Sequence, residues 1–181
     1  MRDTSAIPAS LFKQAMRRLA ATPSIITTAY RGARYGMTAT AVNSVSAEPP
    51  SLLVCVNRTA SISQPLNETQ LFCVNILDAN QQDLCRIFGG GESGEARFRS
   101  GHWESGREAI PYLKEAQANL LCRVAQQSSF STHDIFIARI IETMVRENGS
   151  PLVYLLGEFF ERVRPGAIRP MTGDLPSHGP S

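Results

Sequence analysis

The chain has 181 residues, of which 18 are Lys or Arg and 16 are Asp or Glu, so its formal net charge is +2. This near balance argues against a dedicated nucleic-acid surface, which would show a basic stripe. No apolar run approaches the ~20 residues that span a bilayer. The first residues also lack the apolar core of a signal peptide, so we expect a cytoplasmic protein.

The first part of the chain predicts one helix followed by strands. Apolar side chains at helical spacing place the helix over residues 8–21. An Ile- and Thr-rich strand over residues 24–30 turns at 31–34 into a second strand within the stretch 36–50, and the two strands form a hairpin. The prolines at 49 and 50 end that pairing, because proline has no N–H for the ladder.

Later strands are predicted at residues 51–57, 71–77, 119–125, 135–145 and 152–160. Between them lie a polar connection over 59–69 and a short helix that Asn80 caps and the glycines at 89–91 end. The charged segment 93–108 is predicted to be irregular, with Phe98 and Trp103 as its anchors.

The element pattern favours a mainly β protein. About seven strands without regular strand–helix alternation predict an antiparallel barrel with peripheral helices rather than a doubly wound sheet. We expect one domain over residues 1–163. Residues 164–181 alternate Pro and Gly, and we expect them to form a tail that buries too little surface to order itself.

The four cysteines predict no metal site and no disulfide framework. Cys55, Cys73, Cys85 and Cys122 form no C-x-x-C pair, and no histidine stands at ligand spacing from them. Three of them lie within apolar runs, so free cysteine acting as a small buried hydrophobe is expected.

Common catalytic motifs are absent from the sequence. There is no G-x-G-x-x-G after a strand, no G-x-x-x-x-G-K-[ST], no G-x-S-x-G and no H-E-x-x-H. His133 and Asp134 are adjacent on a predicted strand, so their side chains point to opposite faces and cannot form a proton relay.

The stretch 36–50 has small apolar and hydroxyl side chains, with Met37 and Glu48 as its only large ones. Such a segment lets another group approach the backbone closely and offers it N–H, C=O and O–H partners. A flat ligand with a polar edge needs this arrangement, but a tightly packed strand also fits it, and strand propensity alone explains many of the threonines.

A series of residues that matches a known family in the same order favours the ligand-binding interpretation of this stretch. The run Gly36-Met37-Thr38-Ala39-Thr40-Ala41-Val42, continued by Ser44-Val45-Ser46 and Pro49-Pro50, resembles the signature of the flavin reductase-like, FMN-binding split-barrel family. The resemblance extends over about residues 12–160, through segments such as 72–77, Arg97-Phe98 and 135–137. Four positions depart from the family pattern: Ser131-Thr132 replaces Gly-Asp, Ala138 replaces a glycine, and Leu121 replaces an acidic residue.

This resemblance implies an antiparallel split β-barrel that acts as an NAD(P)H:flavin oxidoreductase. Such proteins are homodimers that bind FMN or FAD noncovalently, take hydride from NADH or NADPH and supply reduced flavin to a separate monooxygenase. His133 is implied on the nicotinamide side of the flavin. The flavin contacts implied are Thr38, Ala39, Thr40, Ala41, Ser44, Val45, Ser46, Cys55, Val56, Asn57, Ser61, Asn75, Phe98 and Tyr154.

Alternatives remain at both the protein and the residue level. The chain could be a flavin-binding split-barrel protein without turnover, a redox sensor or store, whereas a pyridoxamine-phosphate oxidase-like enzyme fits the stretch 36–50 poorly. A hydrogen-bonded structural role is the alternative for His133, and core packing is the alternative for Phe98 and Tyr154. Scattered arginines, without a basic patch for a 2′-phosphate, favour NADH over NADPH.

Overall fold

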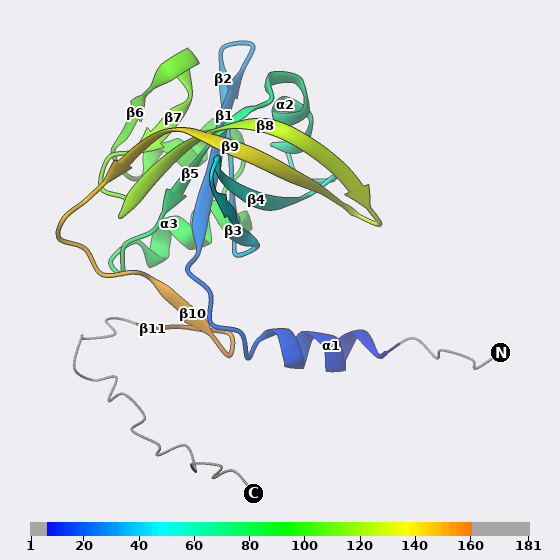
Figure 1. Ribbon diagram of the computed structural model, residues 1–181. Coiled ribbons are helices and arrows are strands. Elements are labelled where there is room, and N and C mark those ends of the chain that lie inside the picture. Colours follow the sequence, from blue (N-terminus) through cyan, green and yellow to red (C-terminus); the bar gives the residue numbers. More distant parts are fainter. Residues whose placement is uncertain (1–6, 161–181) are drawn as a thin grey trace, which may run out of the picture.

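The computed structural model describes residues 7–160, whose main body is a seven-stranded antiparallel sheet (Figure 1). Its strand order is β2-β1-β5-β8-β9-β4-β3. The strands are β1 Ser24–Tyr30, β2 Ala33–Ala39, β3 Val42–Ala47, β4 Pro50–Asn57, β5 Leu71–Ile76, β8 Ala118–Phe130 and β9 His133–Val145. Two small sheets pair β6 Trp103–Ser105 with β7 Pro111–Leu113, and β10 Val153–Leu155 with β11 Glu158–Phe160.

Short helical segments surround this sheet. They are α1 Ala9–Met16, α2 Ser63–Thr69, α3 Gln82–Arg86, the π-helical turn η1 Ile87–Gly91, and the 3₁₀ turns η2 Gly94–Arg99 and η3 Arg107–Ala109. The mainly antiparallel β architecture predicted from the sequence is therefore confirmed. Within the described part of the chain, no helix is both long enough and apolar enough to cross a membrane.

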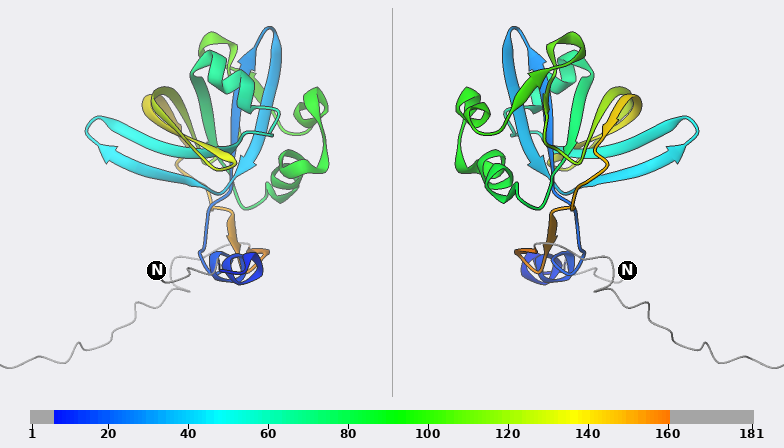
Figure 2. Two further views of the ribbon diagram at one scale, coloured as in Figure 1. Left: turned by 90° about the vertical axis from the view of Figure 1, so that its right-hand side faces the viewer. Right: turned by 90° about the vertical axis from the view of Figure 1, so that its left-hand side faces the viewer.

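The two end strands of the sheet come from one chain segment. Strands β2 and β3 stand at opposite ends of the strand order, yet only Thr40 and Ala41 separate them in the sequence. The sheet must therefore curl until its two ends meet at this bend. Figure 2 shows the β1–β2 and β3–β4 hairpins diverging from a common base. The stretch that we expected to form one strand is thus divided at 40–41 into two strands with different partners.

An apolar core fills the inside of the curled sheet. Fully buried side chains from five strands meet there, including Ile26, Val54, Phe72 and Phe136. Ala39 joins this core at the end of β2 with 6% of its surface exposed. This packing depends on the alternation of β2, because Tyr35 and Met37 point to the same core while Gly36 and Thr38 point away from it.

A second core lies outside β2, where α3, η1 and η2 pack. Phe88, Phe98 and Trp103 meet there with ring centroids 5.1–5.2 Å apart. Phe98 and Trp103 thus anchor the irregular segment, as predicted. Gly36 is required at this contact, because a Cβ built on it would stand 2.6 Å from Cε1 of Phe88.

A buried amide ties four strands together. The Asn75 side chain donates to the Ile25 carbonyl oxygen at 2.8 Å and to Thr27 Oγ1 at 3.1 Å. Its Oδ1 accepts from the Leu113 N–H at 2.7 Å and from Asn119 Nδ2 at 2.8 Å. Strands β1, β5, β7 and β8 therefore depend on one side chain that is fully buried.

Several local predictions were wrong. The short helix that Asn80 was expected to cap begins at Gln82 after Gln81, and no side chain caps its N-terminus. Residues 63–69 form α2 rather than a loop, since a proline in the first turn, here Pro65, is compatible with a helix. The predicted strand 152–160 is the β10–β11 hairpin, which turns at Leu156 and Gly157, both with positive φ. The helix predicted over 8–21 ends at Met16. The predicted tail 164–181 lies outside the described residues.

The segment α1 and the β10–β11 hairpin stand apart from the main body (Figure 1). They are joined to each other by a bridge between Ala21 and Tyr154 and by the Leu156 N–H, which donates to the Arg17 carbonyl oxygen at 2.8 Å. No residue of α1 is buried. Its apolar side chains Leu11, Phe12 and Met16 remain exposed, and so does Leu19 just beyond the helix.

The Asn75 network yields a stability prediction. Asn75→Ala should lower the free energy of unfolding by about 3 kcal/mol, because it leaves several buried donors and acceptors without partners. Urea unfolding followed by circular dichroism measures this change. Asn80→Ala is the matched control, since Asn80 is exposed. Equal unfolding midpoints for the two variants would contradict the expected contribution of the network to the free energy of unfolding.

Candidate functional site

The bend between β2 and β3 is an open surface built from small side chains. Thr40 and Ala41 are exposed, and the Ala41 carbonyl accepts from the Cys55 N–H of β4 at 3.2 Å. Strand β3 lies at the end of the sheet, so one row of its N–H and C=O groups has no strand partner. A flat ligand with a polar rim can lie against such an edge without displacing side chains.

A β-bulge shapes β3 beyond the bend. Ser44 pairs with Leu52 and Ser46 pairs with Ser51, so Val45 is the extra residue between two ladder positions. A bulge breaks the regular ladder and turns the local backbone outward, and the Val45 side chain is 48% exposed. The Ser46 hydroxyl donates to the Glu48 carbonyl oxygen at 2.8 Å, which leaves the Ser44 hydroxyl as the freer one.

The end of β4 brings three of the predicted residues to one face. Asn57 stands directly opposite His133 of β9, and Cys55 stands opposite Ile135. Residues opposite each other in a ladder share a face, so Cys55, Asn57 and His133 lie on the same side of the sheet. Val56 is fully buried in the core and offers only its backbone.

His133 lies at the start of β9, beside a tight turn. Its Nδ1 is 2.9 Å from Thr132 Oγ1, and its side chain is exposed. Asp134 points to the opposite, buried face, where its Oδ1 accepts from Ser129 Oγ at 2.6 Å. The expectation that His133 and Asp134 do not form a relay is therefore confirmed.

Arg58 fixes this turn to the end of β4. Its N–H donates to the Thr132 carbonyl oxygen at 3.0 Å, and its guanidinium group contacts the Ser131 carbonyl oxygen. Ser131 has a φ of 51°, a conformation that glycine adopts at lower cost. The turn thus keeps a backbone suited to glycine although the residue is serine.

The last predicted contact near the site is Ser61, an exposed hydroxyl just before α2. Nη1 of Arg97, from η2, lies 3.5 Å from Ser61 Oγ and donates to the Gly36 carbonyl oxygen at 2.6 Å. Sequence reasoning counted Arg97 among the scattered arginines and within the Arg97-Phe98 match to the family, but not among the site residues. Its place directly before Phe98, an anchor of the second core, is the signal that would have found it.

Four other predicted contacts have structural partners instead. Asn75 is enclosed in its buried network and Phe98 is 5% exposed within the aromatic core, so both expected flavin contacts are corrected to core residues. Tyr154 packs on Phe159 at 5.2 Å between centroids, in the part that stands apart from the main sheet. The Thr38 hydroxyl donates to the Cys85 carbonyl oxygen at 2.7 Å, which holds α3 against β2.

The four cysteines are free, and Cys73, Cys85 and Cys122 are buried, whereas Cys55, which was also expected to be a buried hydrophobe, is only half-buried. Burial raises the pKa of the Cys122 thiol to about 12. Burial also raises the pKa values of Cys73 and Cys85. These three groups therefore stay protonated near neutral pH and contribute packing rather than nucleophiles. Half-buried Cys55 is the one that lies at the candidate site.

Comparisons with known proteins identify the family of this chain. The family model described as "Flavin reductase like domain" matches residues 16–161. The FMN reductase (NADH) RutF of Pseudomonas syringae pv. syringae strain B728a is 42% identical over 163 residues, covering 85% of this chain and 92% of that protein.

Two solved structures extend the comparison. A putative flavin reductase from Haemophilus somnus 129PT aligns with a TM-score of 0.82 at 34% identity, over 85% of this chain and 99% of its own. BorF, the flavin reductase component of a bacterial two-component tryptophan halogenase, aligns with a TM-score of 0.78 at 25% identity, over 84% and 97%.

Proposed function

We propose that this chain, which belongs to the flavin reductase like domain family, transfers a hydride from a reduced nicotinamide to FMN or FAD. The observation that carries the proposal is the open bend at Thr40 and Ala41, which meets the exposed edge of β3 at the point where the sheet ends converge. The relative from Pseudomonas syringae is named for FMN and NADH, which supports the same pair of substrates here.

The residues at the bend fit a flavin ring. Its polar rim needs donors and acceptors, and the unpaired edge of β3 offers both in a fixed row. Thr40, Ala41 and Ser44 are small enough to let a ring lie close to that backbone. Cys55 and Asn57 of β4 line the adjacent face. We propose that these five residues, with Ala39, Val45, Ser46 and Val56 through their backbone, form the ring site.

The chain's part in the reaction is positioning. When bound, the flavin supplies the hydride acceptor, so the protein needs to hold the two ring systems face to face rather than to attack either of them. His133 stands at the open end of β9 with Nδ1 next to Thr132, so Nε2 is left to meet a ligand. We propose that Nε2 hydrogen-bonds the nicotinamide carboxamide or the dinucleotide backbone and thereby fixes the hydride donor.

The proposal extends to the assembly around the reaction. We propose that the curled sheet is the split β-barrel of the family and that reduced flavin passes to a separate oxygenase component, which the role named for BorF supports. A reduced nicotinamide as hydride donor favours a cytoplasmic location.

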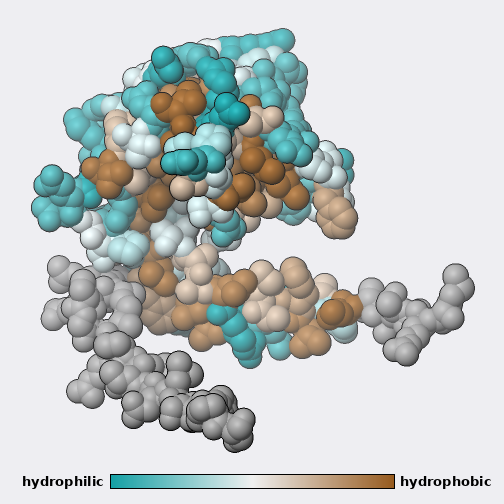
Figure 3. All heavy atoms as spheres, in the orientation of Figure 1, coloured by the Kyte–Doolittle hydropathy of each residue, from teal (hydrophilic) through white to brown (hydrophobic). Residues whose placement is uncertain are grey.

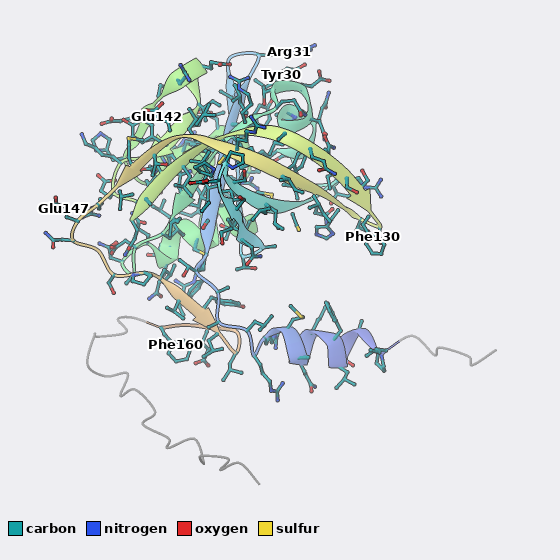
Figure 4. All side chains as sticks on the ribbon, in the orientation of Figure 1. Tyr30, Arg31, Phe130, Glu142, Glu147 and Phe160 are labelled. Carbon is teal, nitrogen blue, oxygen red and sulfur yellow. The ribbon has the colours of Figure 1, made fainter. Side chains whose placement is uncertain are left out.

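A second copy of the chain would cover the apolar face of α1. Figure 3 shows apolar surface along α1 and on the face of the main body above it, with open space between. Phe130 projects at the far end of the long β8–β9 hairpin and is 77% exposed (Figure 4). We propose a homodimer, because exposed apolar side chains gathered on one helix face favour burial against a partner.

The function itself is tested by steady-state turnover of the full chain. We expect NADH to reduce FMN catalytically, with many turnovers per protein molecule, and expect NADPH to be the poorer donor. Oxidation of NADH at 340 nm, with each flavin and each nicotinamide, measures the rates. Flavin that binds and is reduced only once would favour a redox sensor or store instead.

A variant with a bulky side chain at the bend between β2 and β3 provides the control for this assay. Ala41→Trp should abolish binding of FMN and FAD in a folded protein, because Ala41 is exposed and its replacement fills the approach to β3. Ala39 is unsuitable for this test, since its buried side chain would make the same change disrupt the core. Unchanged flavin affinity in folded Ala41→Trp would contradict the proposed site.

His133→Ala should raise the KM for NADH several-fold and leave flavin affinity nearly unchanged. We expect kcat to fall by about ten-fold, which corresponds to about 1.4 kcal/mol of lost positioning and is far less than the loss of a general base would cause. Kinetics at saturating flavin measure both constants. His102→Ala is the matched control, because His102 is an exposed histidine beside Glu115 on another part of the surface. Parent-like constants in both variants would assign His133 a structural role.

The dimer is tested by one charge on α1. Phe12→Glu should shift the sedimenting species from twice the chain mass toward the single chain mass, because a charge would be placed within a buried apolar contact. Lys13→Glu changes charge on a neighbouring side chain outside the apolar set and should leave the assembly intact. A monomeric parent protein, or equal behaviour of both variants, would rule out α1 as the contact.

A further inference from the structure

The turn that carries His133 lies at the tip of a projecting hairpin. Strands β8 and β9 have 13 residues each, and their tip projects from the main body where Phe130 is labelled in Figure 4. All side chains from Ala125 to His133 are exposed. Packing therefore does not fix this tip tightly, since segments with few buried contacts open at a low cost in free energy. The position of the tip depends mainly on hydrogen bonds.

Arg58 supplies two of these hydrogen bonds from outside the hairpin. Its backbone N–H donates to the Thr132 carbonyl oxygen at 3.0 Å, and its guanidinium group donates to the Ser131 carbonyl oxygen. The backbone at Arg58 is itself held at the end of β4, because Asn57 Oδ1 accepts from the N–H and the hydroxyl of Thr59, both at 2.9 Å. Arg58 thus ties the tip to a fixed part of the sheet.

The turn gains from an external bond of this kind. Ser131 has a φ of 51°, in the left-handed region that costs a non-glycine residue conformational energy. A donor on the Ser131 carbonyl oxygen favours the conformation in which that oxygen faces Arg58. Hydrogen bonds from charged donors are also stronger than those between neutral groups. The side chain of Arg58 therefore stabilises the turn beyond what its backbone N–H provides.

The turn also determines where the imidazole of His133 stands. His133 follows Thr132 directly, and its Nδ1 is 2.9 Å from Thr132 Oγ1. A shift of the turn backbone would therefore move both the Cα atom of His133 and the hydroxyl beside its ring. Misplacing a positioning group by about 1 Å can lower a rate by about 10²-fold. A change at Arg58 thus reaches the group that is proposed to hold the hydride donor.

We propose that Arg58 is a positioning residue for the hydride donor. It contacts neither the flavin nor the dinucleotide, and it acts by holding the turn at Ser131 and Thr132, which places His133. This inference rests on the proposed function, because it takes the contact between Nε2 of His133 and the dinucleotide as given. It adds that Arg58 and the strained turn form one unit, so the effect of changing one depends on the other.

The first test is Arg58→Ala in the full chain, which removes the guanidinium group and keeps the backbone bond to Thr132. We expect the KM for NADH at saturating FMN to rise about three-fold, as the loss of one hydrogen bond predicts. The dissociation constant of FMN, from titration followed by flavin fluorescence, should stay within about two-fold. Arg31→Ala is the matched control, because Arg31 is an exposed arginine at the turn between β1 and β2 (Figure 4); it should leave both constants unchanged.

A double-mutant cycle shows whether Arg58 acts through His133. In the His133→Ala background, Arg58→Ala should cause no further rise in the KM for NADH, because the imidazole that Arg58 places is gone. A general structural role would instead add the same loss in both backgrounds. Arg58→Lys, which keeps the charge on a single donor group, should have a KM between those of the parent and Arg58→Ala.

Ser131→Gly provides a rescue and keeps the test decisive if Arg58→Ala fails to fold. Glycine adopts a φ of 51° at lower cost, so the turn keeps its conformation with less help from the guanidinium group. In the Ser131→Gly background, Arg58→Ala should therefore fold and should raise the KM for NADH by less than it does in the parent sequence.

The contrary outcomes are distinguishable from one another. A parent-like KM in folded Arg58→Ala, or an undiminished rise in the Ser131→Gly background, would overturn the inference while leaving flavin reduction intact. A rise that persists in the His133→Ala background would mean that Arg58 contacts the dinucleotide itself, and weaker FMN binding would mean that it contacts the flavin; either result would also overturn the inference. A parent protein that does not oxidise NADH with FMN would contradict the proposed function itself.

Discussion

The fold depends on one geometric constraint: a single chain segment must serve both ends of the sheet. Strands β2 and β3 pair with β1 and β4, which are separated in the strand order by β5, β8 and β9. Only the bend at Thr40 and Ala41 connects them. Every other strand must therefore curl around a common interior to let this short connection be made. The bend is also the place where small side chains leave the backbone open.

Strand β2 makes structural contacts on both of its faces. On one face Met37 and Ala39 fill the core inside the sheet. On the other face, the missing side chain of Gly36 leaves room for the Phe88 ring, and the Thr38 hydroxyl donates a hydrogen bond to the Cys85 carbonyl oxygen. Arg97 then reaches back to the Gly36 carbonyl oxygen from η2. The helical segments are thus positioned by the same strand that leads into the candidate site.

Much of this architecture follows from local sequence patterns. The β-branched strands, the prolines at 49 and 50 and the glycines at 89–91 predict where the elements lie. Pattern alone could not show that residues 36–50 form two strands with different partners, because the division follows from the strand order of the whole sheet rather than from any turn residue. Pattern also could not show that Asn57 and Asn75 have different surroundings in the fold. Both asparagines lie at predicted strand positions, and only the structure shows that Asn57 is at the end of β4 opposite His133 while Asn75 is inside a four-strand network.

The turn before His133 shows how a departure from a family pattern can be compensated within the chain. Serine replaces glycine at 131 and still adopts a φ of 51°, which costs conformational energy that glycine would not incur. Arg58 offsets this cost by bonding both turn carbonyl groups, at Ser131 and Thr132. Thr132, which stands where the family has an acidic residue, keeps a polar atom 2.9 Å from Nδ1 of His133. A hydroxyl there can donate or accept, whereas a carboxylate can only accept. Thr132 therefore gives the imidazole a hydrogen-bond partner without placing a negative charge beside it.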